Sequence, residues 1–589
     1  MVNSGSNGVL ACMDAARESS SDLIRFGLFE VDRRSGELRR QGVKVKLQEQ
    51  PFLLLQMLLE HPGDLVTREQ LQKRIWPSDT FVDFEQGLNN AAKRLREALS
   101  DSADAPRFIE TIPRRGYRFI GTMEVRSLKR MRSLAVLPLE NLSRDPEEEY
   151  FAEGLTEALI TTLAKIGEIR VVSRTSVMLY KGVRKPLNEI ARELGVEAIV
   201  EGTVLRAGDR VRIAAQLIDA AKEAHLWAES YERDLRGVLA LQAEVAQAIA
   251  REIQVKLTPD EKAQLERARP VDRHAYEAYL RGRYHWNKRT AAGIKNGLEY
   301  FQQAIEKDPT YSAAYAGVAD CAAMAGWWGF ASPEEGCGRA KRAALKALEI
   351  DDSIAEAHTS LGFAILHYDY DAPVAERELQ CALELNPNYV LARAWYAVCL
   401  AARGRITEAL TEGEEALRLD PLSLPISMGY AGFLWFAHQW DEEMKFSQRT
   451  LDLDPNFPGG HLFLARAYEG KGIHESAIDE LRKALSLSPG AATFLRELGY
   501  VYARSGQRDA AIKVLEELEE LSKKIYVSPY WRAQIYTALK EYDEAFRWLE
   551  AAYAERSALM AYLKVDPWLE DLHSDPHFQD LMRRMNFPP

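Results

Sequence analysis

The sequence predicts a multidomain chain with three folded parts: an α+β domain first, an α/β domain in the middle and an all-α superhelix last. Three observations support this prediction. Near the amino terminus, strand-like runs give way to helical periodicity and then to a hairpin. A second alternation of strands and helices follows, and prolines recur at a fixed interval in the last half. At 589 residues the chain is also too long for a single hydrophobic core.

Composition and charge limit the possible classes of function. The 47% hydrophobic and 28% charged residues are typical of an ordinary soluble protein. The net charge of −12 excludes a protein that coats nucleic acid along its whole length, because such binding needs a basic surface. Between Asp22 and Glu124, however, 17 Lys and Arg balance 16 Asp and Glu, so the acidity lies downstream. Any contact with DNA must therefore be local.

The cysteine pattern and the lack of long apolar stretches indicate a cytoplasmic protein. The five cysteines show no CxxC pair and no zinc-like spacing with histidines, so neither a disulfide framework, nor a metal site, nor a cofactor is expected. Residues 1–22 are rich in Ser, Gly and Ala and are expected to be a disordered leader. No apolar stretch is long enough to span a bilayer, so no membrane contact is predicted.

The first domain is expected over residues 23–123. Strand-like runs cover Leu23–Val31, Gly36–Arg40 and Val43–Leu47, with turn-forming residues between them, and predict a small antiparallel sheet. The hydrophobic period then changes to that of a helix, and a break at HPGD precedes a second helix for which Thr67 is placed as the N-cap.

A third helix over Phe84–Leu99 has two chemically different faces. Apolar residues fall on one side, whereas Gln86, Asn90, Lys93, Arg94 and Glu97 fall on the other. Amide side chains can bond adenine edges, and Arg or Lys can bond guanine or phosphate, so this face has the chemistry of a major-groove reader. Taken alone, the pattern also fits a solvated helix face.

The sequence after this helix favours the first interpretation. Residues Arg107–Gly121 predict two strands joined around a tip at Pro113–Gly116. The tip carries Arg114 and Arg115, and the return strand carries Arg118. A basic hairpin beside a polar helix face can grip the DNA backbone next to the groove that the helix reads.

This order of sheet, helices and basic hairpin resembles the OmpR/PhoB-type winged helix-turn-helix, which is also found in CadC-like regulators. The resemblance covers residues 23–123, with Arg94–Arg96 and Gly116–Arg118 matching its motifs. It implies double-stranded DNA as a partner, and Tyr117 as a packing residue. The DNA-binding residues that it implies are Asn89, Asn90, Lys93 and Arg94 toward bases beside Gln86, Arg96 and Thr111 toward phosphates, and Arg114 or Arg115 in the minor groove beside Arg118.

The same family is associated with phosphorelays, in which a receiver domain precedes the DNA reader. Only residues 1–22 come before the first predicted strand, so no receiver domain is expected here. Control is therefore expected to come from the carboxy-terminal side of the chain.

A basic linker, residues 124–132, is expected to lead into an α/β domain over residues 133–256. Strands are predicted at Leu134–Leu139 and Ile169–Arg174, around a helix at Tyr150–Ile166, and a three-stranded meander lies between helices at Pro186–Leu194 and Leu241–Ile253. The pattern resembles the TolB-like domain of bacterial multidomain regulators and cyclases, which implies an accessory or sensing role. No dinucleotide, phosphate-loop, nucleophile-elbow or zinc-protease motif occurs, so no enzyme activity is predicted.

A 34-residue period relates four prolines in the last half of the chain. They are Pro387, Pro421, Pro455 and Pro489, each after a helix ending of the form ALELNP. Small residues recur where two helices of a pair must approach closely, among them Gly362, Ala375 and Gly499. The pattern resembles tetratricopeptide repeats, and about eight units are expected over residues 271–560, leaving an inner groove free for binding.

Residues 561–589 are expected to cap the array. His573 and His577 lie four positions apart around Pro576 without a third ligand nearby, which disfavours a metal pair. Trp327 and Trp328 fit a ligand platform or, more simply, aromatic packing at a repeat junction.

Together the resemblances imply a DNA-binding transcriptional regulator with a protein or other effector on the repeats, and RNA polymerase as a further partner. An alternative is a repeat scaffold in which the winged helix serves assembly. The arginines at the hairpin tip argue against the scaffold, because assembly does not need them.

Overall fold

The computed structural model describes residues 23–586 except 33–35, 41–42, 77–83, 126–130, 144, 146–147, 235–236, 254, 256 and 267–270. The chain divides into two compact units, one up to Arg130 and one from Met131 onward. The expected leader, residues 1–22, and most of the expected linker lie outside the described residues.

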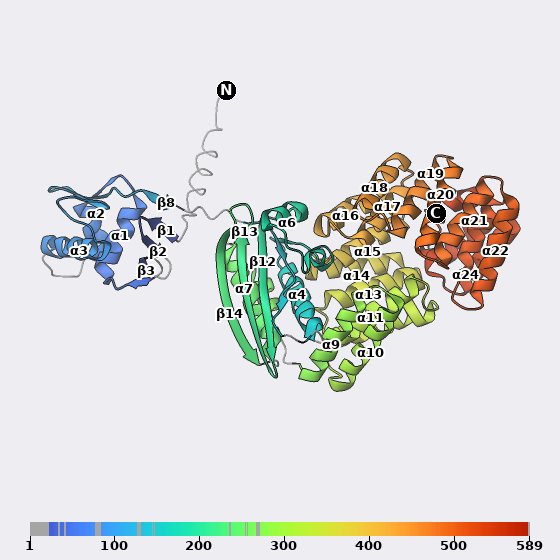
Figure 1. The fold of residues 1–589 in the computed structure, drawn as a ribbon, viewed down its shortest axis with the longest axis horizontal. Coiled ribbons are helices and arrows are strands. Elements are labelled where there is room, and N and C mark those ends of the chain that lie inside the picture. Colours follow the sequence, from blue (N-terminus) through green and yellow to red (C-terminus); the bar gives the residue numbers. More distant parts are fainter. Residues whose placement is uncertain are drawn as a thin grey trace, which may run out of the picture. The chain divides into compact units, whose positions relative to one another are not determined.

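The described residues of the first unit form two small sheets and three helices (Figure 1). One sheet has the order β4-β3-β2-β1-β8 and the other has the order β5-β7-β6. The elements are β1 (Leu23–Phe26), β2 (Phe29–Asp32), β3 (Glu37–Arg40), β4 (Val43–Val45), α1 (Glu49–Glu60), β5 (Leu65–Thr67), α2 (Arg68–Ile75), α3 (Phe84–Leu99), β6 (Ile109–Ile112), β7 (Gly116–Phe119) and β8 (Met123–Val125).

The first predicted strand is in fact a hairpin. Gly27 adopts a φ of +53°, a left-handed conformation that favours glycine, and the chain reverses so that Phe26 pairs with Phe29. The predicted N-cap of the second helix is confirmed, because the Thr67 hydroxyl accepts from the backbone N–H of Gln70 while the Gln70 side chain accepts from the N–H of Thr67. The core of the unit is built from Phe26, Leu55 and other buried apolar side chains.

The second unit begins with an α/β domain. Its sheet has the order β11-β9-β12-β13-β14 with β10 beside β12, and helices α4 and α7 pack on it (Figure 1). The elements are β9 (Ser133–Val136), β10 (Glu140–Asn141), α4 (Glu149–Ala164), β11 (Arg170–Val171), α5 (Arg174–Val177), η2 (Met178–Tyr180), α6 (Leu187–Leu194), β12 (Ala198–Ala207), β13 (Arg210–Asp219), β14 (Ala224–Asp234), α7 (Val238–Glu252) and α8 (Pro259–Glu266). The predicted meander is confirmed as β12, β13 and β14.

Helix pairs follow in an arc of stacked units (Figure 1). The first helices of the pairs are α9 (Arg273–Trp286), α11 (Ser312–Trp327), α13 (Ala355–Ala364), α15 (Val390–Ala402), α17 (Leu424–Phe436), α19 (Pro458–Gly470), α21 (Ala492–Arg504) and α23 (Pro529–Ala538). Their partners are α10 (Ala291–Lys307), α12 (Arg339–Ile350), α14 (Ala372–Leu385), α16 (Ile406–Leu419), α18 (Trp440–Leu453), α20 (His474–Leu487), α22 (Arg508–Ser522) and α24 (Tyr542–Ala554). The short π-helical segments η4 (Glu334–Gly338) and η5 (Ile365–Asp369) lie within the second and third pairs.

The small residues of the repeat pattern lie where two helices touch. A β-carbon on Gly362 would come within 2.7 Å of Leu379, and one on Gly499 would come within 2.7 Å of Val514. Ala375 is fully buried at the same kind of position. The predicted close approach of the paired helices is therefore confirmed, and a larger side chain at these glycines would push the helices apart.

The α/β domain and the repeats share one continuous core, which was not predicted from the sequence. Leu280 and Tyr311 of the repeats belong to the same buried cluster as the α/β domain. The Asn388 amide, at the start of the fourth pair, donates to the carbonyl oxygens of Ala164 and Ile169 at 3.0 and 2.9 Å. Asp420 accepts from the backbone N–H and the hydroxyl of Ser176. Buried polar bonds thus fix the domain against the array.

The end of the chain folds back over the repeats as η6 (Ala558–Tyr562), η7 (Pro567–Leu572) and α25 (Pro576–Arg584). Helix α25 packs Phe578 and Leu581 against the last pair, as a cap does. The two turns before it lie against first helices of several earlier pairs, through Tyr562 and Trp568. The expectation of an inner groove left free for binding is therefore wrong for this face, because the chain's own end covers part of it.

Within the described residues, no helix is long and apolar enough to cross a membrane. The same part of the chain contains no group of three or more His, Cys, Asp or Glu side chains arranged to hold a metal ion.

Candidate nucleic-acid interface

Helix α3 buries one apolar face in the core and exposes a polar face on the opposite side. Leu88, Ala91, Ala92, Leu95 and Leu99 are buried in the core of the first unit. Their helical periodicity leaves the opposite residues on the surface, and Gln86, Asn89, Asn90, Lys93 and Arg94 are all exposed. The structure thus brings the four predicted base-facing residues and Gln86 together along one helix.

Asn89 is held in place from beneath. Its side-chain oxygen accepts from the hydroxyl of Tyr117 at 3.0 Å and from the guanidinium of Arg68 at 3.2 Å. Both bonds use the amide oxygen, so the amide nitrogen is the group that is left for a partner outside the domain. Tyr117 itself is buried, as expected of a packing residue. Arg68, which also forms an ion pair with Glu85, was not among the predicted residues.

Arg96 connects the helix to the wing, which consists of β6, β7 and the tip between them. One guanidinium nitrogen donates to the backbone oxygen of Ile109 at 2.9 Å and to the Thr111 hydroxyl at 2.7 Å. The two residues predicted to meet phosphates are therefore bonded to each other. This geometry gives Arg96 a positioning role between α3 and β6.

The wing is set by a glycine that no other residue can replace without strain. Gly116 has a φ of +155°, and a β-carbon there would lie 2.0 Å from the carbonyl oxygen of Val66. β7 can therefore pair closely with β5. At the tip, Arg114 and Arg115 are exposed, whereas Arg118 on β7 lies 3.6 Å from Glu110 and its charge is partly balanced.

Asp101 fixes the loop between α3 and the wing. Its carboxylate accepts from the backbone N–H groups of Arg107, Phe108 and Ile109 at 2.7 to 3.1 Å. Burial by itself raises the pKa of Asp101, but these backbone donors outweigh it and hold the pKa below its ordinary value. The carboxylate therefore stays ionised and sets the start of β6 relative to the helix.

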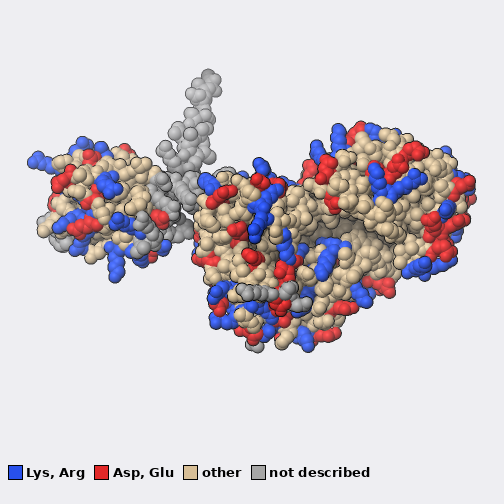
Figure 2. Space-filling model, viewed as in Figure 1, with Lys and Arg blue, Asp and Glu red and all other residues tan. Residues whose placement is uncertain are grey.

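The electrostatics of the unit are mixed, as its near-zero sequence charge requires. Lys and Arg side chains project from the visible face between acidic ones (Figure 2). On α3, Lys93 and Arg94 form no ion pair with a described residue, so their charges remain available to an anionic partner.

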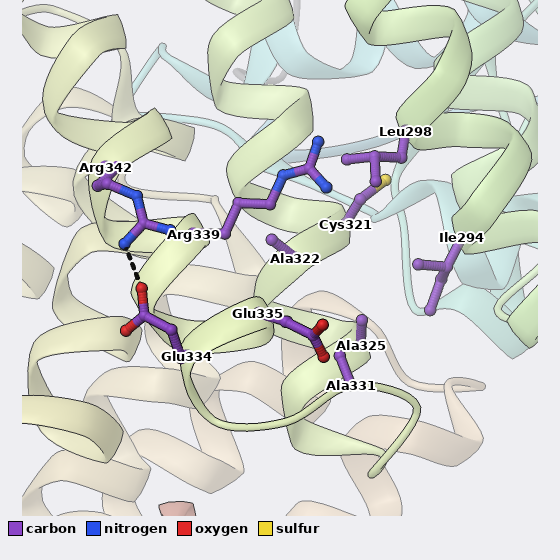
Figure 3. Close-up of a pocket in the computed structure, with 10 residues that line it drawn as sticks. All are labelled: Ile294, Leu298, Cys321, Ala322, Ala325, Ala331, Glu334, Glu335, Arg339 and Arg342. Atoms are coloured by element: carbon purple, nitrogen blue, oxygen red, sulfur yellow. Dashed lines mark hydrogen bonds and ion pairs between the residues drawn. The ribbon is translucent and has the colours of Figure 1, made fainter. Parts of the chain in front are cut away.

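A separate cavity of about 350 Å³ lies in the second unit between α10, α11, η4 and α12. Apolar side chains, two glutamates and two arginines line it, and Arg342 forms an ion pair with Glu334 at its rim (Figure 3). Nearby, Trp327 packs edge-on against Phe363 and Trp395, so it serves as packing at a repeat junction.

Two family models match the chain. Residues 42–119 match the family described as "Transcriptional regulatory protein, C terminal". Three overlapping or neighbouring stretches, 371–423, 462–524 and 496–559, match "Tetratricopeptide repeat".

Relatives of the chain include transcriptional regulators and a protein named as a cyclase. The transcriptional regulator HilA of Salmonella typhimurium is 26% identical over 508 residues, which cover 84% of this chain and 88% of that protein. The phosphate regulon transcriptional regulatory protein PhoB of Rhizobium meliloti is 36% identical over 103 residues, or 18% of this chain and 44% of that protein. A protein named putative adenylate cyclase 3, also from Rhizobium meliloti, is 37% identical over 235 residues.

The cyclase match covers 40% of this chain and 40% of the cyclase, so the chain spans two fifths of that relative's length. HilA, in contrast, is matched over most of both chains. The chain therefore carries the DNA-binding domain of a transcriptional regulator at its amino terminus and tetratricopeptide repeats, of the kind that bind proteins, in its second half.

Proposed function

We propose that the protein binds promoter DNA by inserting α3 into the major groove and that the wing grips the adjacent backbone. The observation that carries this proposal is the exposed row of amides and cations on α3 beside the two exposed arginines of the wing tip. Amides suit adenine edges and cations suit guanine edges or phosphates, so one helix face offers both kinds of readout.

Individual roles follow from position. Gln86, Asn89, Asn90, Lys93 and Arg94 would face base edges, because they share the exposed side of α3. Arg96 and Thr111 would meet a phosphate as a bonded pair, Arg118 would contact the backbone, and Arg114 or Arg115 would enter the minor groove.

The second unit would supply control. A protein or other effector on the repeats, with the TolB-like α/β domain fixed beside them, would change the affinity for DNA or the recruitment of RNA polymerase. Such control requires that the effector bind the DNA-competent state with a different affinity from the other states. Catalysis would have no part in it, which accords with the missing catalytic motifs.

Selection of genomic fragments by the full-length protein, followed by titration of the selected site, tests the proposal. Arg94→Ala is expected to weaken binding to that site by about 1–3 kcal/mol, because a good base contact is worth that much. Lys44→Ala is the matched control, since Lys44 is an exposed cation on β4 and its loss changes the net charge equally.

If Arg94→Ala and Lys44→Ala reduce affinity equally, Arg94 does not read a base. If the full-length protein selects no DNA and shows no salt-sensitive binding, the whole proposal is wrong.

A further inference from the structure

Residues 558–572, hereafter the tail segment, lie against first helices from successive repeats. The segment consists of η6, η7 and the short stretch between them. Its described contacts reach α11, α17, α19, α21 and α23, all first helices of their pairs, and η5, which directly continues the first helix α13. The surface formed by these elements is called the inner face below. A repeat array offers such a face to extended ligands.

Tyr562 anchors one end of the tail segment. Its ring stacks on Phe436 and meets the edge of Trp327, with centroids 5.6 and 6.1 Å apart. Its hydroxyl lies 3.1 Å from Nε2 of His367, which is fully buried. Ring contacts and a hydrogen bond thus fix the position of Tyr562.

Asp566 is bonded on both carboxylate oxygens. One oxygen accepts from the Tyr530 hydroxyl at 2.8 Å and from the Gln534 amide at 2.6 Å. The other accepts from the backbone N–H of Trp568 at 2.9 Å, which fixes the turn between the two residues. Without Asp566, the donors of the inner face would be buried and unpaired.

Trp568 fills an aromatic and cationic recess on the inner face. Its ring stacks on Tyr500 with centroids 3.7 Å apart and meets Trp435 edge-on at 5.5 Å. The guanidinium of Arg496 lies 5.2 Å from its centroid. Its indole N–H donates to the Glu469 carboxylate at 3.3 Å. Trp, Tyr and Arg grouped around one buried indole are the residues that dominate binding energy at interfaces.

The tail segment differs from the cap that follows it. Helix α25 covers the end of the last pair through apolar packing, which any solenoid end requires. The tail segment instead runs across earlier repeats and forms hydrogen bonds with individual polar side chains of the inner face. The inner face is therefore complementary to the tail segment in the way that a binding site is complementary to a peptide.

We propose that the inner face is a peptide-binding site whose resident ligand is the tail segment, and that it takes an outside partner carrying a carboxylate followed two residues later by an indole. This inference deepens the proposed function, since it rests on the repeats binding a protein partner. The partner's carboxylate replaces Asp566 between Tyr530 and Gln534, and its indole replaces Trp568 on Tyr500.

Because the tail segment is covalently attached to the repeats, an outside partner must compete with it for the inner face. A segment tethered to its own site competes at an effective concentration in the millimolar range. An outside segment of equal intrinsic affinity therefore occupies few molecules until the tail segment is weakened or the partner binds a second surface as well. The repeats would therefore respond only to a partner that binds the inner face more tightly than the tail segment does or that also binds a second surface.

The test uses a fluorescein-labelled peptide of residues 559–573 and the full-length protein. Trp568→Ala removes the main anchor of the resident segment, so the peptide is expected to bind this variant at least tenfold more tightly than wild type. The same peptide with Trp568→Ala is the control ligand and should bind at least tenfold more weakly. Adding Tyr500→Ala to the protein variant should abolish the gain, because Tyr500 forms the floor of the recess.

The proposal is overturned if folded Trp568→Ala protein, checked by circular dichroism, binds the peptide no better than wild type. Should that variant not fold, amide exchange on wild type decides. Amides of residues 562–569 exchanging at least tenfold faster than those of α21 support a detachable ligand, whereas equal rates contradict it. Binding to selected DNA, measured on the same samples, is independent of these outcomes, so failure here is distinguishable from failure of the DNA-binding proposal.

Discussion

The neighbours of His367 determine which nitrogen of its imidazole ring carries the proton. Nδ1 lies 2.8 Å from the backbone oxygen of Phe363, which can only accept, so Nδ1 carries the proton. Nε2 is then the acceptor for the Tyr562 hydroxyl. Burial lowers the pKa of His367 to about 4, because a charged imidazole has no water to solvate it here.

This residue should make the second unit less stable in mild acid. The unfolded chain, with a histidine pKa of about 6.5, binds the proton more tightly than the folded protein does. Lowering the pH from 7 to 5 should therefore cost about 2 kcal/mol of unfolding free energy through His367 alone. Urea unfolding at both pH values checks this, and His367→Gln should change the pH difference by that amount, the contribution of His367, while the other titrating groups keep theirs.

His577 provides the control, since its side chain is 83% exposed and His577→Gln should leave the pH difference unchanged. An unchanged pH difference in His367→Gln would show that the folded protein tolerates the charged imidazole.

At the scale of single residues, the sequence predicted which side chains are exposed better than it predicted their hydrogen-bond partners. The amphipathic period of α3 was enough to place Lys93 and Arg94 on the surface. It could not show that Asn89 is held by Tyr117, because that bond joins residues 28 positions apart. The ionised state of Asp101 was equally hidden, since it depends on backbone donors whose positions exist only in the folded loop.

At the scale of elements, we expect the wing to contact DNA without regard to the base sequence. Its tip carries two exposed arginines on a strand pair that Gly116 holds close to β5. Replacing Arg114 and Arg115 together with Ala should weaken binding to selected and unselected DNA by similar factors. The slope of log affinity against log salt should fall by about 0.9 for each phosphate that the variant no longer neutralises.

Binding isotherms at several salt concentrations give this slope, with Arg94→Ala as the contrasting variant that should lose preference for the selected site instead. An unaltered slope in the double variant would remove the wing from the interface.

Elements with a strong local signal were predicted, and those set by distant contacts were not. The regular proline period and the small residues at Gly362 and Gly499 anticipated the paired helices. The run Leu23–Val31 looked like one strand because the turn at Gly27 interrupts it without a proline or a polar cluster. The path of the tail segment was hidden too, because it depends on side chains from several repeats rather than on its own periodicity.

At the scale of the whole molecule, the chain combines two units that each have their own hydrophobic core. The second unit is larger than its sequence pattern suggested, because the α/β domain and the repeats share buried residues. The bonds that join them pair side chains with backbone atoms that are distant in the sequence, as Asn388 does with Ala164. Such bonds leave no periodic trace in a sequence.

These bonds predict how the protein unfolds. Asn388→Ala leaves buried carbonyl oxygens without a donor and should cost about 1–3 kcal/mol. Because Asn388 joins two parts of one core, amide exchange should accelerate in β12 and in α15 by the same factor, while α1 of the first unit stays unchanged. Asn456 follows Pro455 as Asn388 follows Pro387, but it is exposed, so Asn456→Ala should alter neither part. Faster exchange confined to β12 would mean that the α/β domain opens alone, and it would then be free to respond to an effector without the repeats.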